Sequence, residues 1–146
     1  MRLASGCPFC GFEEPAVTVH RDARVQAFIS RAPINRYHVL VTSHAHFEHL
    51  VDVPSDVLAA AVSVAQQVTA AIAAVARPAA ITLLSDDDLT GAGFNEVAHW
   101  KLHLIPRHRG DGIVIDWRRT PDPGAEVRGG YASEIRGALK ATPRHG

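Results

Sequence analysis

The sequence predicts an α+β domain in which a five-stranded antiparallel sheet carries one long helix, with a second, short helix near the C-terminus. Five short segments have the alternating or β-branched apolar pattern that is typical of strands. One much longer segment repeats its apolar residues at helical spacing. The order strand, strand, strand, helix, strand, strand favours helices packed on one face of an antiparallel sheet.

Three strands are predicted before the long helix. The segments "PAVTVHRD" (15–22) and "RVQAFIS" (24–30) flank the turn-like "RDA" and therefore predict a hairpin. The segment "YHVLVTS" (37–43) predicts the third strand, because β-branched and apolar residues dominate it.

The long helix is predicted over about residues 55 to 76. Pro54, Ser55 and Asp56 form a helix start, and Arg77 followed by Pro78 ends the helix. Between these ends, apolar side chains recur at the spacing of one helix face. They are Leu58, Val62, Ala65, Val68 (or Thr69), Ile72 and Val75.

The last two predicted strands are "AAITLLS" (79–85) and "VAHWKLHLIP" (97–106), separated by a loop of acids and glycines. Successive side chains of a strand point to opposite faces, so the final strand has an apolar core side and a polar side. The core side has Ala98, Trp100, Leu102 and Leu104, and the polar side has His99, Lys101 and His103. We expect the functional site on the polar side.

The chain after Arg107 is rich in Gly, Pro and Arg. Within this part, only "IVIDW" (113–117) has the apolar pattern of an ordered segment. A short helix is predicted at "ASEIRGAL" (132–139). With 146 residues, the chain is expected to form a single domain over 1–146, with its core at about 5–115 and a C-terminal tail at about 116–146.

The composition argues against nucleic-acid and membrane partners. Lysine plus arginine equals aspartate plus glutamate at 15 each, so no overall field attracts polyanions. The longest apolar run, "VLAAAVSV", is far shorter than the roughly 20 residues that span a bilayer. The N-terminus has no apolar signal region, and we therefore expect a cytoplasmic location.

The motif "CPFCG" places Cys7 and Cys10 at the spacing of a zinc knuckle. Tetrahedral zinc needs two more ligands, and the chain offers His44, His46, His49, His99 and His103. A redox dithiol or two unpaired thiols are the alternatives, although a thioredoxin-like pair should begin a helix after a strand. Four isolated histidines are expected to have no chemical role, namely His20, His38, His108 and His145.

These motifs resemble the histidine triad (HIT) family of nucleotide hydrolases and transferases. The similarity covers about the first 115 residues, from "CPFC" through "VQAFISRAPINRYHVLVTSHAH" to "VAHWKLHLIPR" and "GDG". The family's last strand alternates three histidines with apolar residues, and "HWKLHLIPR" matches that pattern except at its centre. The residue that differs, Lys101, occupies the position of the family's nucleophile.

The resemblance implies a role for each matching residue. His99 matches the first histidine, which binds the metal in zinc-containing bacterial members. Lys101 replaces the middle histidine, which attacks the α-phosphate, and His103 matches the third, which assists through hydrogen bonds. The implied ligands of a structural zinc ion are Cys7, Cys10, His46 and His99, with His49 as the substitute for His46.

Positions that bind substrate in the family also differ. Ser30 stands where the family has a ribose-binding aspartate, and Asp88 stands where it has a loop asparagine. Phe94, Asn95 and Glu96 replace a glycine, a glutamine and a small polar residue. Two of these changes bring carboxylates toward the expected phosphate, where like charges cost about 1 kcal/mol even in water. The changes argue against ordinary nucleotide binding.

Three functions are compatible with this pattern. We slightly favour a divergent enzyme that acts on a different small molecule, with Lys101, His103 and Glu96 as catalytic residues and Ser30, Asp88, Phe94 and Asn95 around the substrate. Because lysine is almost wholly an ammonium at neutral pH, an electrostatic role is favoured over nucleophilic attack. The alternatives are the family's usual hydrolase or transferase activity and a non-catalytic, zinc-stabilised binding protein. The resemblance also implies a homodimer that joins two sheets edge to edge.

Overall fold

The computed structural model describes residues 3–90, 93, 95–114 and 121–141. The chain forms two compact units, Met1–Asp111 and Gly112–Gly146. The first unit contains the sheet and the long helix α1 (Ser55–Ala76), and the second contains the helix α2 (Ala125–Ala141).

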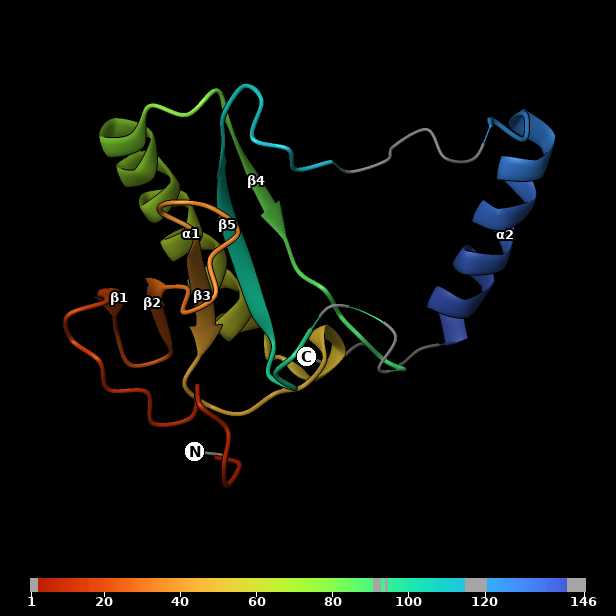
Figure 1. Cartoon of the computed structure of the whole chain (residues 1–146). Coiled ribbons are helices and arrows are strands. Elements are labelled where there is room, and N and C mark those ends of the chain that lie inside the picture. The colour runs from red at the N-terminus through yellow and green to blue at the C-terminus, as the bar shows by residue number, and fades with distance from the viewer. Residues whose placement is uncertain (1–2, 91–92, 94, 115–120, 142–146) are drawn as a thin grey trace. The chain divides into compact units, whose positions relative to one another are not determined.

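The sheet has five antiparallel strands in the order β1-β2-β3-β5-β4, and α1 lies across one of its faces (Figure 1). The strands are β1 (Thr18–Arg21), β2 (Val25–Ile29), β3 (Val39–Ser43), β4 (Ala80–Leu84) and β5 (Lys101–Arg107). This arrangement confirms the predicted fold. The strand order places β5 in the interior of the sheet, and β1 and β4 form its edges.

Helix α1 has the predicted bounds, because Arg77 adopts a left-handed conformation (φ 46°) and donates its N–H to the carbonyl of Ala73. Its buried residues are Ala61, Val64, Ala65, Val68 and Ile72. The predicted face was therefore wrong at Val62 and Val75, which are 57% and 66% exposed. Apolar residues occur all around this helix, so spacing alone left its buried face ambiguous.

By length and composition, α1 is also apolar enough to cross a membrane. Its buried side chains nevertheless belong to the hydrophobic core cluster, together with Val25, Val41 and Trp100 from the sheet and the segment before β5. The core helix of a sheet-and-helix domain can meet the same criteria of length and composition.

Strand β5 begins at Lys101, later than predicted, so His99 precedes the strand. The N–H of His99 donates to the carbonyl of Val97 (2.7 Å), and the N–H of Trp100 donates to that of Phe47 (2.6 Å). The regular pairing of β3 with β5 starts at Thr42 and Lys101. Before α1, a short 3₁₀ helix spans Leu50–Asp52.

Helix α2 is longer than the short helix predicted at 132–139. At its start, the Asp122 carboxylate accepts the N–H of Gly124 (2.9 Å) and pairs with Arg128 (3.2 Å). The piece "IVIDW" is not a strand at Ile113 and Val114, and its residues 115–117 lie outside the described residues.

The two faces of the sheet are covered by different parts of the chain. Val25 and Ala27 of β2 belong to the core cluster with α1. Gln26 and Phe28 alternate with them and meet the N-terminal segment, where Phe9 lies 5.5 Å from Phe28 between ring centroids. The side chain of Gln26 donates to the carbonyl of Phe9 (2.9 Å). The polar side of β5 therefore lies under the cysteine-containing segment.

Candidate metal centre and candidate active site

Four potential metal ligands converge beside the start of β5. The donor atoms of Cys7, Cys10, His46 and His99 all lie within 4.8 Å of one another. The Nδ1 atom of His99 lies 3.3 Å from Cys7 Sγ and 3.8 Å from Cys10 Sγ, and Nδ1 of His46 lies 3.5 Å from Cys10 Sγ. Sulfur and nitrogen ligands of a tetrahedral zinc ion should be about 3.6 Å apart, given the usual bond lengths. The donor set and its spacing therefore fit zinc.

Neighbouring groups orient both histidines toward the centre of this cluster. The Nε2 atom of His99 lies 3.0 Å from the carbonyl of Ser43, which can only accept, so Nε2 carries the proton and Nδ1 faces the sulfurs as a lone pair. The Nε2 atom of His46 lies 3.5 Å from the Glu48 carboxylate. Such outer hydrogen-bond partners fix the tautomer and strengthen a metal-binding imidazole.

Of the two histidines considered for the third position, His46 belongs to the cluster and His49 does not. The Nδ1 atom of His49 lies 3.5 Å from the carboxylate of Asp87, outside the cluster. That carboxylate also accepts the N–H of Leu50 (2.9 Å), which ties the loop before β5 to the segment before α1.

Lys101 is only 5% exposed, and its ammonium binds protein groups. It donates one hydrogen bond to Oδ1 of Asn95 and another to the carbonyl of Val97 (2.9 Å). Its nitrogen also lies 5.4 Å from the centroid of the Phe9 ring, within reach of a cation–π contact. The lysine therefore fastens the turn at 95–97 to the strand that follows it.

Burial lowers the pKa of Lys101 to about 8, and the charges of Cys7 and Asp86 oppose this shift. The ammonium form still predominates at pH 7. The ammonium is held in place by its hydrogen bonds to Asn95 and Val97. Asp86, which sequence reasoning did not select, is the carboxylate whose charge acts on Lys101 and on His103.

His103 is linked to His38, which was expected to be isolated. The backbone N–H of Ile34 donates to Nδ1 of His38 (3.1 Å), so the proton of the neutral ring is on Nε2. That Nε2 lies 3.0 Å from Nδ1 of His103 and donates to it. His103 must then carry its own proton on Nε2. His38 is therefore not isolated, because the register of β3 against β5 brings it to His103.

Burial keeps both of these rings neutral. Desolvation lowers the pKa of His38, and it lowers the pKa of His103 to about 4, where the nearby charges of His38 and Lys101 act in the same direction. At neutral pH, the Ile34 amide therefore donates to His38, and His38 donates to His103, so both hydrogen bonds run in the same direction.

The other residues proposed to bind substrate are less closely gathered. Ser30 is half-buried beside His38, and its N–H donates to the His38 carbonyl (2.9 Å). Asp88 accepts the N–H groups of Thr90 (3.1 Å) and Gly93 (3.0 Å) and so organises its own loop. Glu96 is exposed, and Phe94 lies outside the described residues.

The comparisons with known proteins agree with this geometry. The HIT domain family matches residues 11–110, more than half of the chain. The chain belongs to the HIT family. An uncharacterised HIT-like protein of Mycobacterium tuberculosis is 31% identical to this HIT protein over 129 residues, which are 84% of this chain and 88% of the relative.

Two solved structures extend the likeness. A HIT family protein from Bacillus anthracis is 25% identical, with a TM-score of 0.80 over 93% of this HIT protein and 99% of that chain. A zinc-bound histidine triad family protein from Mycobacterium smegmatis is 26% identical, with a TM-score of 0.66 over 91% and 97% of the two chains. This HIT protein thus has the family fold together with a cysteine and histidine cluster suited to zinc.

Proposed function

We propose that this protein is a divergent HIT enzyme that acts on a small molecule other than the family's usual nucleotide substrates. The observation that carries the proposal is the hydrogen-bonded pair of His38 and His103. His38 is buried and His103 is half-buried, and a backbone amide fixes the direction of the hydrogen bond between them. Imidazoles that are preorganised in this way are typical of acid–base sites. In the neutral pair, His103 can donate its Nε2 proton to a leaving group or to a developing negative charge.

Lys101 has a supporting role in this proposal. A nucleophilic amine must reach its substrate, but this one is almost fully buried and donates to Asn95 and Val97. We assign to it the positioning of the 95–97 turn and a fixed positive charge beside His103. Glu96 is exposed, and this weakens the assignment of Glu96 as a catalytic residue that the sequence favoured.

The metal centre has a structural role in the proposal. The four ligands join the N-terminal segment, the segment after β3 and the residue before β5, which are 36 to 92 positions apart in the chain. A zinc ion there would hold Phe9 over Lys101. Reduced thiols at such a site are also compatible with the cytoplasm, the location we propose.

The proposal is tested with the family's own reaction. Wild type, Lys101→His and Lys101→His/His103→Asn are incubated with nucleoside phosphoramidates and dinucleoside polyphosphates. We expect no turnover by wild type, and turnover by Lys101→His only if the rest of the nucleotide site survives. Turnover by wild type would overturn the proposal in favour of the family's usual activity.

A second assay addresses catalysis itself. Wild type is screened against p-nitrophenyl phosphates and carboxylic esters, with His103→Asn as the test variant and His108→Asn as a matched control at an exposed histidine. We expect hydrolysis that His103→Asn loses by at least about 100-fold, the usual contribution of a general acid or base. If these compounds raise the melting temperature of the protein without any turnover, the result would instead support a non-catalytic binding protein. The burial of Lys101 favours this alternative.

A further inference from the structure

Three consecutive carboxylates, Asp86, Asp87 and Asp88, follow β4, and their surroundings differ. The carboxylate of Asp87 lies 3.5 Å from Nδ1 of His49, on the side of the segment before α1. The carboxylate of Asp88 accepts the N–H of Gly93 (3.0 Å) and so belongs to the loop between β4 and β5. The position of Asp86 relative to the candidate active site therefore has to be established separately.

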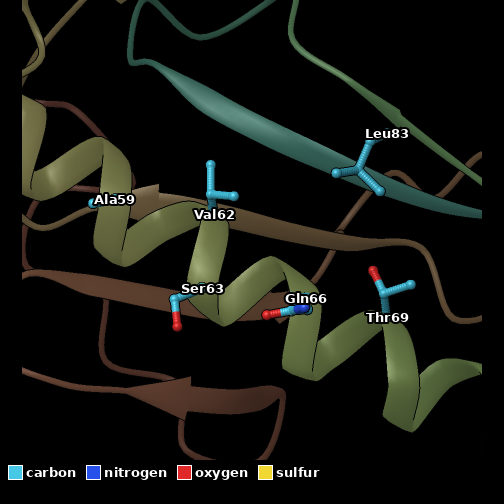
Figure 2. Close-up of a pocket in the computed structure, with 6 residues that line it drawn as sticks. All are labelled: Ala59, Val62, Ser63, Gln66, Thr69 and Leu83. Atoms are coloured by element: carbon cyan, nitrogen blue, oxygen red, sulfur yellow. The ribbon is translucent and has the colours of Figure 1, made fainter.

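The pairing of β4 with β5 places Asp86 on the polar side of the sheet. Leu83 lines a hollow together with side chains of α1, so it lies on the face that the helix covers (Figure 2). Its neighbour Leu84 is therefore on the opposite face, where it pairs with His103. Asp86 follows two residues later, and continued alternation places it on the same face as Leu84, next to Lys101 of the antiparallel partner strand.

The carboxylate of Asp86 lies directly against the backbone of Gly93. A Cβ atom added to Gly93 would be 2.5 Å from Oδ2 of Asp86 and 3.0 Å from its Oδ1. Glycine allows this close approach because it has no side chain, and a larger residue would displace the carboxylate. The N–H of Gly93 is itself bound by Asp88, so the surface against which the carboxylate packs is fixed. Asp86 thus has a defined place beside the candidate active site.

The negative charge of Asp86 reaches the ionisable groups of that site. It raises the pKa of His103 and of Lys101, against the larger opposite effect of burial. This agrees with the position that the strand pairing gives to Asp86. The positive charge of Lys101 and the negative charge of Asp86 then largely compensate each other, so that together they offer an anionic ligand little net attraction.

We propose that Asp86 is a specificity-determining residue that makes the site select an uncharged acyl group, the carbonyl of an ester or amide, over a phosphate. This inference rests on the proposed function, in which His103 donates its Nε2 proton to the substrate. A phosphate at that place brings its negative charges close to the Asp86 carboxylate, and like charges at short range lower the affinity. A carbonyl oxygen accepts the same proton without this repulsion.

A purely structural role is the alternative for Asp86. The ammonium of Lys101 is almost fully buried, and a nearby negative charge stabilises a buried cation. In that role, removal of the carboxylate lowers the stability of the protein but leaves its preference between charged and uncharged ligands unchanged. In the role that we propose, removal of the carboxylate raises the affinity for phosphates specifically. A measurement of ligand affinity therefore distinguishes the two roles.

The test compares two ligands that share a phenyl ring and differ in charge, phenyl phosphate and benzamide. Isothermal titration calorimetry measures both affinities for the full chain, and the NMR signals of the His103 imidazole verify that each ligand binds at the site. We expect wild type to bind benzamide at least about tenfold more tightly than phenyl phosphate, because a like charge within a few ångströms has an effect of this order.

Asp86→Asn removes the charge and keeps the shape of the side chain. We expect this variant to bind phenyl phosphate at least about tenfold more tightly than wild type, and benzamide within about twofold of wild type. Asp87→Asn makes the same chemical change one residue later and is the matched control, with both affinities within about twofold of wild type. Asp86→Ser is a second variant that removes the charge, and circular dichroism and metal content verify that each variant is folded.

Three outcomes would overturn the role of Asp86. The first is a wild-type protein that binds phenyl phosphate as tightly as benzamide, or that binds no benzamide. The second is an equal gain in phenyl phosphate affinity for Asp86→Asn and Asp87→Asn, because that would be a general effect of charge. The third is the absence of any gain in both Asp86 variants, which would leave the carboxylate with its structural role alone.

The failure of this inference and the failure of the proposed function are distinguishable. Turnover of p-nitrophenyl esters that His103→Asn abolishes, together with affinities that Asp86→Asn leaves unchanged, would support the enzyme and refute the role of Asp86. The expected affinities without turnover of any ester would support the role of Asp86 in ligand selection and refute catalysis. The binding measurements do not depend on activity, so each result is obtained independently of the other.

Discussion

The Nε2 atom of His38 lies 3.0 Å from Nδ1 of His103, and the amide of Ile34 fixes the direction of that hydrogen bond. The contact joins the residue before β3 to the interior strand β5, 65 positions later in the chain. It leaves His103 with a proton on Nε2 while Lys101, two residues earlier, is held by the 95–97 turn. In the proposed enzyme, the acid–base chemistry is therefore centred on His103.

The first prediction concerns stability as the pH falls. An unfolded histidine takes up a proton near pH 6.5, whereas His103 in the folded chain stays neutral until about pH 4. The unfolded state thus binds more protons in this window, and stability is lost as the pH falls from about 6.5 to about 4. The loss due to His103 should be on the order of 2 kcal/mol, measured by urea unfolding.

His103→Asn isolates that contribution, because its side-chain oxygen can still accept from His38. Acid effects on the metal ligands are the same in both proteins and cancel in the difference. The variant should lose less free energy of unfolding than wild type between pH 6.5 and 4.5. Parallel curves for the two proteins would contradict the pKa assigned to His103.

The second prediction concerns the anchoring of the 95–97 turn. Lys101→Met keeps an apolar stem but removes the donor to Asn95 and Val97, which leaves their oxygens unsatisfied. The free energy of unfolding should fall by about 1–3 kcal/mol. The exposed neighbour Glu96 is the control, because Glu96→Gln should change it by less than about 0.5 kcal/mol. Equal stability of Lys101→Met and wild type would rule out the anchoring role.

The third prediction concerns metal content. We expect about one zinc ion per chain, and its removal by a chelator should lower the melting temperature, because structural metal binding contributes folding free energy. His46→Ala should lose the metal. His49→Ala should retain it, because His49 pairs with Asp87 outside the cluster. The opposite pattern, or a metal-free protein of equal stability, would show that these ligands are misassigned.

The fourth prediction concerns the carboxylate behind His46. Glu48→Gln removes the negative charge 3.5 Å from Nε2 of His46 and should weaken zinc binding by about 10-fold or more. Asp52 lines the same polar hollow as Glu48, so Asp52→Asn is a matched control. Competition with a fluorescent chelator measures both affinities. Equal weakening by the two variants would point to a general charge effect.

Local patterns were sufficient for much of this protein. The alternating segments, the start of α1 at Ser55 and its end at Ala76 followed from residue types within a few positions of each element. The "CPFC" motif indicated a metal cluster, and the family resemblance then implied Cys7, Cys10, His46 and His99, which converge in the structure. Propensity, turn chemistry and strand alternation act over short distances, and these features depend on nothing else.

The remaining features depend on which distant segments meet. Only the register of β3 against β5 brings His38 to His103, and only the turn at 97–99 places Lys101 against Asn95 and not against Glu96. The burial of Lys101 likewise requires Phe9, 92 positions away, to cover it. The sequence by itself determined the fold, and its resemblance to the family implied the expected ligands of a metal and placed Lys101 at the position of the family's nucleophile. The tertiary structure alone decided the partners of His103 and Lys101, because hydrogen bonds and desolvation depend on positions in space that no local pattern encodes.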